Sequence, residues 1–80
     1  MRGGLKILSG ADVVDILAAF GFVVVRAKKH IKLRRAGVNG DETLIVPNHF
    51  PVAKGTLRAI FLRASAYVPQ AELRSHFYNE

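Results

Sequence analysis

The hydrophobic positions between residues 9 and 21 repeat with the period of an α-helix. Ser9 is expected to cap this helix, because its hydroxyl can accept a backbone N–H while Asp12, three residues on, completes a capping box. Gly21 is expected to end it, since glycine adopts the left-handed conformation without steric strain. Four side chains at positions i, i+3, i+4 and i+7 form its predicted apolar face: Val13, Ile16, Leu17 and Phe20.

Three strands are predicted after this helix, at residues 22–26, 30–34 and 42–46. The first is rich in β-branched and aromatic residues, and the third is closed by Pro47. A turn is predicted over residues 37–41, where glycine, asparagine and aspartate gather. Because the links between the strands are short, an antiparallel meander is the expected topology.

The second predicted strand alternates strictly between polar and apolar residues. Ile31 and Leu33 are expected to face the core, because successive side chains of a strand point to opposite faces. His30, Lys32 and Arg34 are then expected to share the other face. The sequence therefore predicts a cationic sheet face that carries a histidine.

A second amphipathic helix is predicted after a connecting loop at residues 48–53. It is expected to begin at Thr56 or in the turn before it. A short last helix, roughly residues 69–77, can dock through Leu73 and Phe77. The apolar stripe of the second helix consists of Leu57, Ile60, Phe61 and Ala64.

These elements predict an α+β fold in the order α-β-β-β-α. A three-stranded antiparallel sheet carries two helices on one face, and a short C-terminal helix follows. Half of the 80 residues are apolar, which is enough for one core. A single domain is therefore expected over residues 1–80, with an N-terminal tail at 1–8 and a C-terminal extension at 67–80. The absence of cysteine from the sequence excludes disulfides and thiolate zinc sites.

The net positive charge of the chain favours a negatively charged binding partner. The chain carries 12 Lys and Arg against 6 Asp and Glu, a formal charge of +6, which favours nucleic acid or an acidic protein surface. The apolar run at residues 18–25 is far shorter than the ~20 residues that cross a bilayer, and no apolar segment follows the N-terminal charge. No membrane association and a cytoplasmic location are expected. Six cations fall within ten residues, with no acid between them: Arg26, Lys28, Lys29, Lys32, Arg34 and Arg35.

His30 is the candidate catalytic residue, because histidine can act as a general acid or base near neutral pH. Metal-free RNA cleavage needs a base for the ribose 2′-hydroxyl and cations for the charge that develops on the phosphate. The residues around His30 offer both. The alternative is a solvated histidine that binds phosphate passively.

Other polar residues are candidates for supporting roles. His49 can be a second acid or base, an RNA contact, or a loop histidine that caps a turn. Lys54 and Arg58 flank a helix start that can attract phosphate, although an ordinary helix start with solvated flanks fits as well. His76 is expected to pack or to face solvent. Three scattered histidines without clustered carboxylates predict no metal site, and no cofactor is expected.

Several of these segments resemble the HicA toxin family in order and spacing, over about residues 5–66. A Gly-Thr-Leu-Arg-x-Ile segment with an upstream Pro-x-His is fairly specific in combination. The matching segments are Ser-Gly at 9–10, Gly-Phe at 21–22, Arg26 four residues before His30, Val-Pro-Asn-His at 46–49, and Gly-Thr-Leu-Arg-Ala-Ile at 55–60.

The resemblance implies a fold like that of the double-stranded-RNA-binding domain. It also implies a type II toxin that cleaves mRNA without a metal and so inhibits translation and growth. The essential histidine of the family falls on His30, and its Pro-x-His histidine falls on His49. A HicB-type antitoxin is expected to cover the His30 face in a hetero-oligomer. The residues expected to bind RNA are Lys28, Lys29, Lys32, Arg34, His49, Lys54 and Arg58.

The chain departs from the family pattern where Lys28 and Lys29 replace the Gly-Ser that usually precedes the histidine. Lysine disfavours the positive φ that a tight turn can require, and a hydroxyl that can contact RNA is lost. Two alternatives to a nuclease follow. One is a non-catalytic RNA-binding module or inactive HicA homologue. The other is a protein-interaction domain whose basic face meets an acidic antitoxin.

Overall fold

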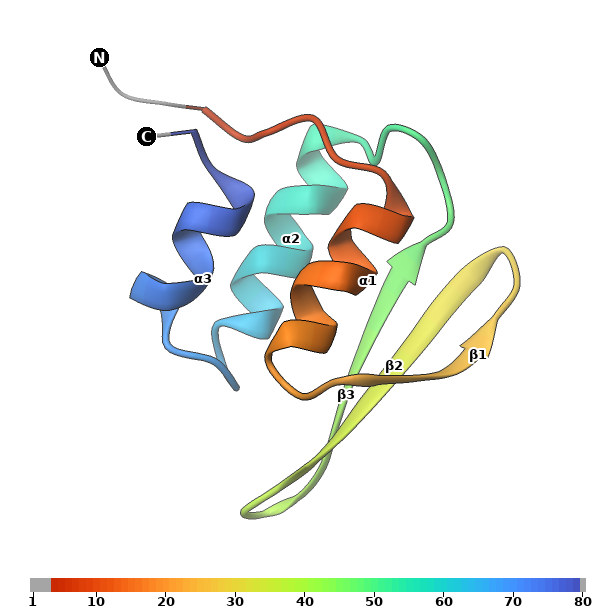
Figure 1. Ribbon diagram of the computed structural model, residues 1–80, viewed down its shortest axis with the longest axis vertical. Coiled ribbons are helices and arrows are strands. Elements are labelled where there is room, and N and C mark those ends of the chain that lie inside the picture. The colour runs from red at the N-terminus through yellow and green to blue at the C-terminus, as the bar shows by residue number, and fades with distance from the viewer. Residues whose placement is uncertain (1–3, 80) are drawn as a thin grey trace.

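The order of helices and strands is the predicted one in a computed structural model, which describes residues 4–79 (Figure 1). The elements are α1 (Gly10–Ala19), β1 (Val23–Ala27), β2 (His30–Gly37), β3 (Gly40–Pro47), α2 (Lys54–Ala64) and α3 (Gln70–Phe77). The strands form one antiparallel sheet in the order β1-β2-β3; α1 and α2 pack on one face of it, and α3 packs against α2. The predicted α+β fold is therefore confirmed. Residues 1–3 of the expected tail and Glu80 of the expected extension lie outside the described residues.

Both ends of α1 form as the sequence predicts. The backbone N–H of Asp12 donates to Ser9 Oγ at 3.0 Å, and the backbone N–H of Ser9 donates to Asp12 Oδ2 at 2.9 Å. Gly21 has a φ of 95°, the left-handed conformation that ends the helix. α2 begins at Lys54, ahead of Thr56, and has no side-chain cap.

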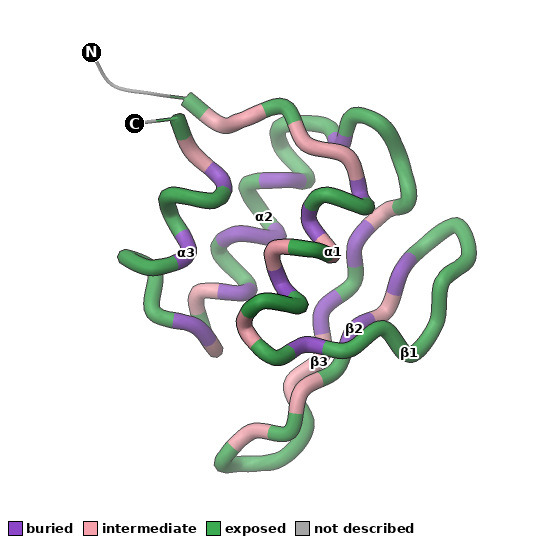
Figure 2. Tube along the Cα trace, viewed as in Figure 1, coloured by how far each residue is buried: buried purple, intermediate pink, exposed green. Residues whose placement is uncertain are grey.

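One hydrophobic core lies between the sheet and the helices (Figure 2). In α1 the predicted apolar face is only partly enclosed, since Ile16 and Phe20 are half-buried. Leu73 and Phe77 dock α3 as predicted. The predicted core residues that are buried are Val13, Leu17, Ile31, Leu33, Leu57, Ile60, Phe61, Ala64, Leu73 and Phe77.

The β2–β3 hairpin turns more tightly than the predicted turn at residues 37–41. Gly37 pairs directly with Gly40, so only Val38 and Asn39 form the turn. Gly40, directly after this two-residue loop, has a φ of 119°, and the pairing of Gly37 with Gly40 keeps both strands paired up to their ends. β2 and β3 are consequently longer than predicted, and their exposed tip projects beyond the helices (Figures 1 and 2).

The first strand begins at Val23, one residue later than predicted, and forms an exposed edge of the sheet. Phe22 is buried just ahead of it, whereas Val23, Val24 and Val25 are 63%, 40% and 46% exposed. The helices pack on β2 and β3 and leave this edge strand largely uncovered. The β-branched residues that predict the strand therefore do not belong to the core.

Arg35 lies on the helix side of the sheet and connects three parts of the fold. Its guanidinium forms an ion pair with Glu42 at 2.7 Å and lies 4.9 Å from the centre of the Phe22 ring. It also donates to the carbonyl oxygens of Phe20 and Tyr67, each at 2.8 Å. This member of the basic run is therefore a structural residue and does not share the surface of the others.

The two ends of the described chain lie together. Leu5 forms an isolated antiparallel bridge with Tyr78, and the backbone N–H of Lys6 donates to the Phe77 carbonyl at 2.8 Å. Residues 4–6 are thus fixed against the end of α3. Within residues 4–79, no helix has the length and apolar character needed to span a membrane.

Candidate functional site

The sheet surface that faces away from the helices carries the polar side chains predicted for β2. His30 and Arg34 are exposed and Lys32 is half-buried, while Ile31 and Leu33 point into the core. Strict alternation along β2 places these two sets on opposite faces, as predicted. We call the outer surface, with His30, Lys32, Arg34 and their register partners, the open face.

Cross-strand pairing brings residues of β3 onto the open face. Ile45 is the register partner of Lys32, and Thr43 is the partner of Arg34. Directly paired residues of antiparallel strands place their side chains on the same face. Ile45, which is 49% exposed, therefore forms an apolar spot among cations.

A β-bulge in β1 brings Arg26 onto the open face. Val24 pairs with Leu33, and the next pair joins Arg26 to Lys32, so Val25 is an extra residue in this strand. Without the bulge, Val25 would lie opposite Lys32 and Arg26 would fall on the core side, because a shift of one residue reverses every side chain. The bulge thereby completes a row across the three strands: Arg26, Lys32 and Ile45.

The turn between β1 and β2 forms without a left-handed residue. In the described part of the chain, positive φ occurs only at Gly21 and Gly40. Lys28 and Lys29 therefore build this turn with ordinary backbone angles, and the loss of the family's glycine does not prevent it. The expectation that lysine would disturb the turn is wrong, because no positive φ is needed there.

The loop after β3 lies between this turn and the start of α1. Asn48 donates to the carbonyl oxygens of both turn lysines, from Nδ2 at 3.1 Å and from its backbone N–H at 2.9 Å. On the other side, the backbone N–H of Gly10 donates to the His49 carbonyl at 2.8 Å. A Cβ at Gly10 would overlap the Pro47 carbonyl oxygen, so this close approach requires glycine. The backbone on both sides of the two histidines is thus fixed.

His30 and His49 line the same shallow hollow. His30 is the first residue of β2 and pairs with Pro47, which brings the loop histidine to the same end of the sheet. Both histidines are exposed, so a substrate can reach both rings. The residues that line this hollow are His30, Ile45, Pro47, His49, Ala53 and Thr56.

An adjoining hollow shares His30 and Ile45 with the first and is lined mainly by cations. Its remaining residues are Arg26, Lys28, Lys29 and Lys32. Positive charge gathered in one concave surface attracts phosphate and stabilises negative charge that develops there. The arrangement can therefore combine a histidine acid or base with a phosphate site.

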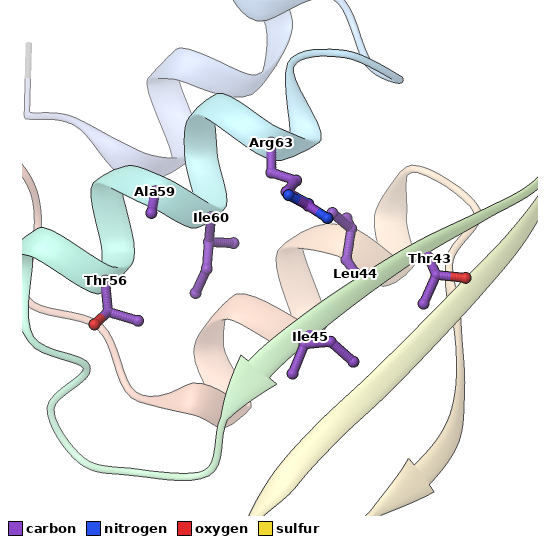
Figure 3. A pocket seen from close by; sticks show the side chains of 7 residues that line it. All are labelled: Thr43, Leu44, Ile45, Thr56, Ala59, Ile60 and Arg63. Atoms are coloured by element: carbon purple, nitrogen blue, oxygen red, sulfur yellow. The ribbon is translucent and has the colours of Figure 1, made fainter.

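A third, largely apolar hollow lies between β3 and α2 (Figure 3). Ile45 lines it from the sheet, and Arg63 reaches toward β3 from the helix. Because Ile45 belongs to all three hollows, they form one continuous surface from the turn lysines to α2. The lining residues are Thr43, Leu44, Ile45, Thr56, Ala59, Ile60 and Arg63.

The residues that line the three hollows all lie in the part of the chain that matches a known family. The family model described as the HicA toxin of bacterial toxin–antitoxin matches residues 10–66 of the 80-residue chain. The chain belongs to the HicA toxin family. The resemblance of the sequence is thereby confirmed, and the match includes the whole sheet, α1 and α2. In two further comparisons, no curated protein and no solved structure matched the chain.

The fold of this HicA-family toxin gathers some of the predicted site residues and separates others. Those that it brings around His30 are Lys28, Lys29, Lys32 and His49. Arg34 lies farther along β2, where it faces Asp41 at 3.8 Å. Lys54 and Arg58 are exposed on α2 and line none of the three hollows.

Two residues of the HicA-family site were not predicted from the sequence. Arg26 belongs to the basic run, but simple alternation from Val23 predicts that its side chain lies on the core side of the sheet. The structure places it on the open face. Ile45 was assigned only to a strand, and its central place among the hollows depends on the position of α2. No pattern in the sequence predicts the bulge. The Pro-Asn-His segment, in contrast, does point to the loop that carries His49.

The third histidine lies away from the three hollows, and no aspartate or glutamate within residues 4–79 lines them. The His76 ring packs edge-on against Phe20, with centroids 5.6 Å apart, in line with its expected packing role. Among residues 4–79, no group of three or more histidine, cysteine, aspartate or glutamate side chains is placed to hold a metal ion.

Proposed function

We propose that this HicA-family toxin is a metal-independent mRNA endoribonuclease with His30 as the general base. The observation that carries the proposal is the placement of two histidines in one open hollow beside a cluster of cations. Proton transfer and stabilisation of developing charge are what cleavage by the ribose 2′-hydroxyl requires. Cleavage of mRNA in the cytoplasm then stops translation and growth.

The proposed reaction is an attack within the RNA chain. The ribose 2′-oxygen attacks the adjacent phosphorus while His30 takes the 2′-hydroxyl proton. The bond from phosphorus to the 5′-oxygen of the next nucleotide breaks, and that oxygen takes a proton from protonated His49. The products are a 2′,3′-cyclic phosphate and a 5′-hydroxyl. Lys28, Lys29 and Lys32 hold the phosphate and offset the charge on its non-bridging oxygens.

The remaining predicted RNA-binding residues lie farther from the reacting phosphate and contact other parts of the RNA in the proposed complex. Arg34, 47% exposed at its side chain, can release Asp41 to contact a phosphate, because an exposed pair at 3.8 Å is weak. Lys54 and Arg58 lie on the first turns of α2, where free backbone N–H groups also favour phosphate. These residues would bind the RNA on either side of the cleaved bond.

The test is cleavage of a labelled mRNA fragment by purified protein in the presence of EDTA. We expect fragments that end in a 2′,3′-cyclic phosphate and begin with a 5′-hydroxyl, with a rate unchanged by the chelator. Analysis of both fragment ends by mass spectrometry distinguishes this chemistry from hydrolysis by water. Intact RNA with folded protein, or 5′-phosphate ends, would contradict the proposal.

Replacement of Lys28–Lys29 by Gly-Ser separates the nuclease from the non-catalytic alternative. If the lysines hold the reacting phosphate, the variant cleaves more slowly and binds RNA less tightly. Its salt slope falls by about 1.4, because each lysine that neutralises a phosphate of a single strand contributes about 0.7. The measurement is RNA binding by fluorescence anisotropy at several salt concentrations. A wild type that binds but does not cleave, together with a variant that does cleave, would favour the inactive homologue.

We also propose that a HicB-type antitoxin covers the His30 face in a hetero-oligomer. Support comes from the family, whose model describes a toxin of a toxin–antitoxin pair, and from the open face itself. Its cations suit an acidic partner, and the exposed Ile45 beside the apolar hollow offers surface to bury. A toxin whose RNA affinity is no greater than that of an unrelated basic protein would favour antitoxin binding as the main role of this face.

A further inference from the structure

The helix α1 and the open face carry charges of opposite sign. The helix α1, which packs on the covered face of the sheet, has only Asp12 and Asp15 as charged residues, and both are exposed. The open face and its adjoining turn carry the cations of the basic run, apart from the structural Arg35. A polyanion that approaches along α1 is repelled, whereas one that lies across the open face is attracted.

The open face also displays apolar side chains between its cations. Ile45, 49% exposed, ends the row that begins with Arg26, and Val23, 63% exposed, is the register partner of Arg34. An A-form duplex hides its bases and presents phosphates and 2′-hydroxyls, so it gains little from such groups. A single strand can place its unstacked bases against them.

The shape of the open face leads to the same conclusion. Three strands spaced about 4.8 Å apart make a surface only about 10 Å wide between its outer strands. A convex duplex would touch it along one line, whereas a single strand can follow the row of side chains from one edge to the other. Attack by the 2′-oxygen also needs a nucleotide that can bring this oxygen in line with the leaving oxygen, and an unpaired nucleotide has that freedom.

We propose that the open face binds single-stranded RNA, with Arg26 as a phosphate ligand placed by the β-bulge and Ile45 in contact with a base. This inference rests on the proposed function, because it names the form of RNA that the His30 site takes. Arg26 is suited to the role because it lies beside Lys32 in the row and lines the hollow that contains His30. Its planar guanidinium can hold two phosphate oxygens at once.

The experiment measures RNA binding by fluorescence anisotropy with a His30→Ala protein, in which the probe stays intact. The probes are a 12-nucleotide single strand and the same strand in a 12-base-pair duplex. We expect at least about ten-fold tighter binding of the single strand, and a further loss of about ten-fold with Arg26→Gln. Lys6→Gln removes the same charge beside the end of α3 and is expected to weaken binding less than about two-fold.

Arg26→Lys keeps the positive charge but lacks the planar guanidinium, so we expect it to bind RNA more tightly than Arg26→Gln and less tightly than arginine. The circular dichroism spectrum of each variant shows whether it is folded. Equal affinity for the duplex, or equal effects of Arg26→Gln and Lys6→Gln, would overturn the inference. Cleavage by the wild type is measured separately. Preference for the single strand without cleavage would refute the proposed nuclease alone, and cleavage with preference for the duplex would refute the inference alone.

Discussion

Replacement of His30 by alanine is expected to abolish growth arrest and to slow RNA cleavage by about 10²–10⁴-fold, the usual contribution of a general base. The side chain is exposed at the first position of β2, and it supports no contact of the core. Its loss should therefore leave the fold intact while it removes the proposed acceptor of the 2′-hydroxyl proton. In the proposed reaction His49 acts as the acid on the opposite side, so it is not expected to replace His30.

The measurement is induced expression in a test bacterium, with transcripts followed by primer extension. Wild-type protein should stop growth and produce new 5′ ends, and His30→Ala should do neither although it accumulates in folded form. His76→Ala is the matched control, because it removes an imidazole that packs on Phe20 away from the open face. If His30→Ala cleaved RNA at the wild-type rate, the assignment of the general base would be wrong.

The largest effect on stability is expected from Arg35→Met, which should lower the free energy of unfolding by about 2–4 kcal/mol. The side chains of Arg35 and Glu42 are only 26% and 18% exposed, so the carboxylate would lose its partner in a mostly dehydrated position. The carbonyl oxygens of Phe20 and Tyr67 would lose their donor as well. Methionine keeps much of the apolar volume, which limits the change to polar contacts.

Thermal and urea unfolding measure this loss, and a decrease in Tm of roughly 10–25 °C is expected for a domain of this size. Arg34→Met is the control, because it removes the neighbouring arginine and the same charge. The Arg34–Asp41 pair is exposed at 47% and 62% and separated by 3.8 Å, so its loss should change the free energy of unfolding by less than about 1 kcal/mol. Equal effects of the two substitutions would contradict the structural role of Arg35.

The parts of the fold that the sequence predicts well depend on contacts close along the chain. The capping box of Ser9 and Asp12 and the left-handed Gly21 involve neighbouring residues, so their chemistry can be recognised without tertiary information. The apolar stripe of α2 and the alternation of β2 are periodic, and a period already specifies which side faces the core. These features agree with one another and limit the fold to an α+β sandwich.

Boundaries and strand geometry were predicted less well, because they depend on pairing between strands. The tip of the β2–β3 hairpin was expected over residues 37–41 and consists of Val38 and Asn39 alone, since both glycines pair. The bulge at Val25 is equally invisible in the sequence, since nothing local distinguishes it from its neighbours. A register is a property of two strands, and it decides which face Arg26 occupies.

The sequence by itself determined the family and the fold class, and it supplied His30 as the candidate on which the proposed mechanism rests. Residue type, spacing and periodicity are sufficient for these, because they are local properties of the chain. Only the tertiary structure decided that His49 lines the same hollow as His30. It also decided that Arg26 lies with the cations around His30, whereas Arg35 is paired with Glu42 on the helix side of the sheet. The reason is that strand pairing and loop packing bring distant residues together, and no local pattern records which ones meet.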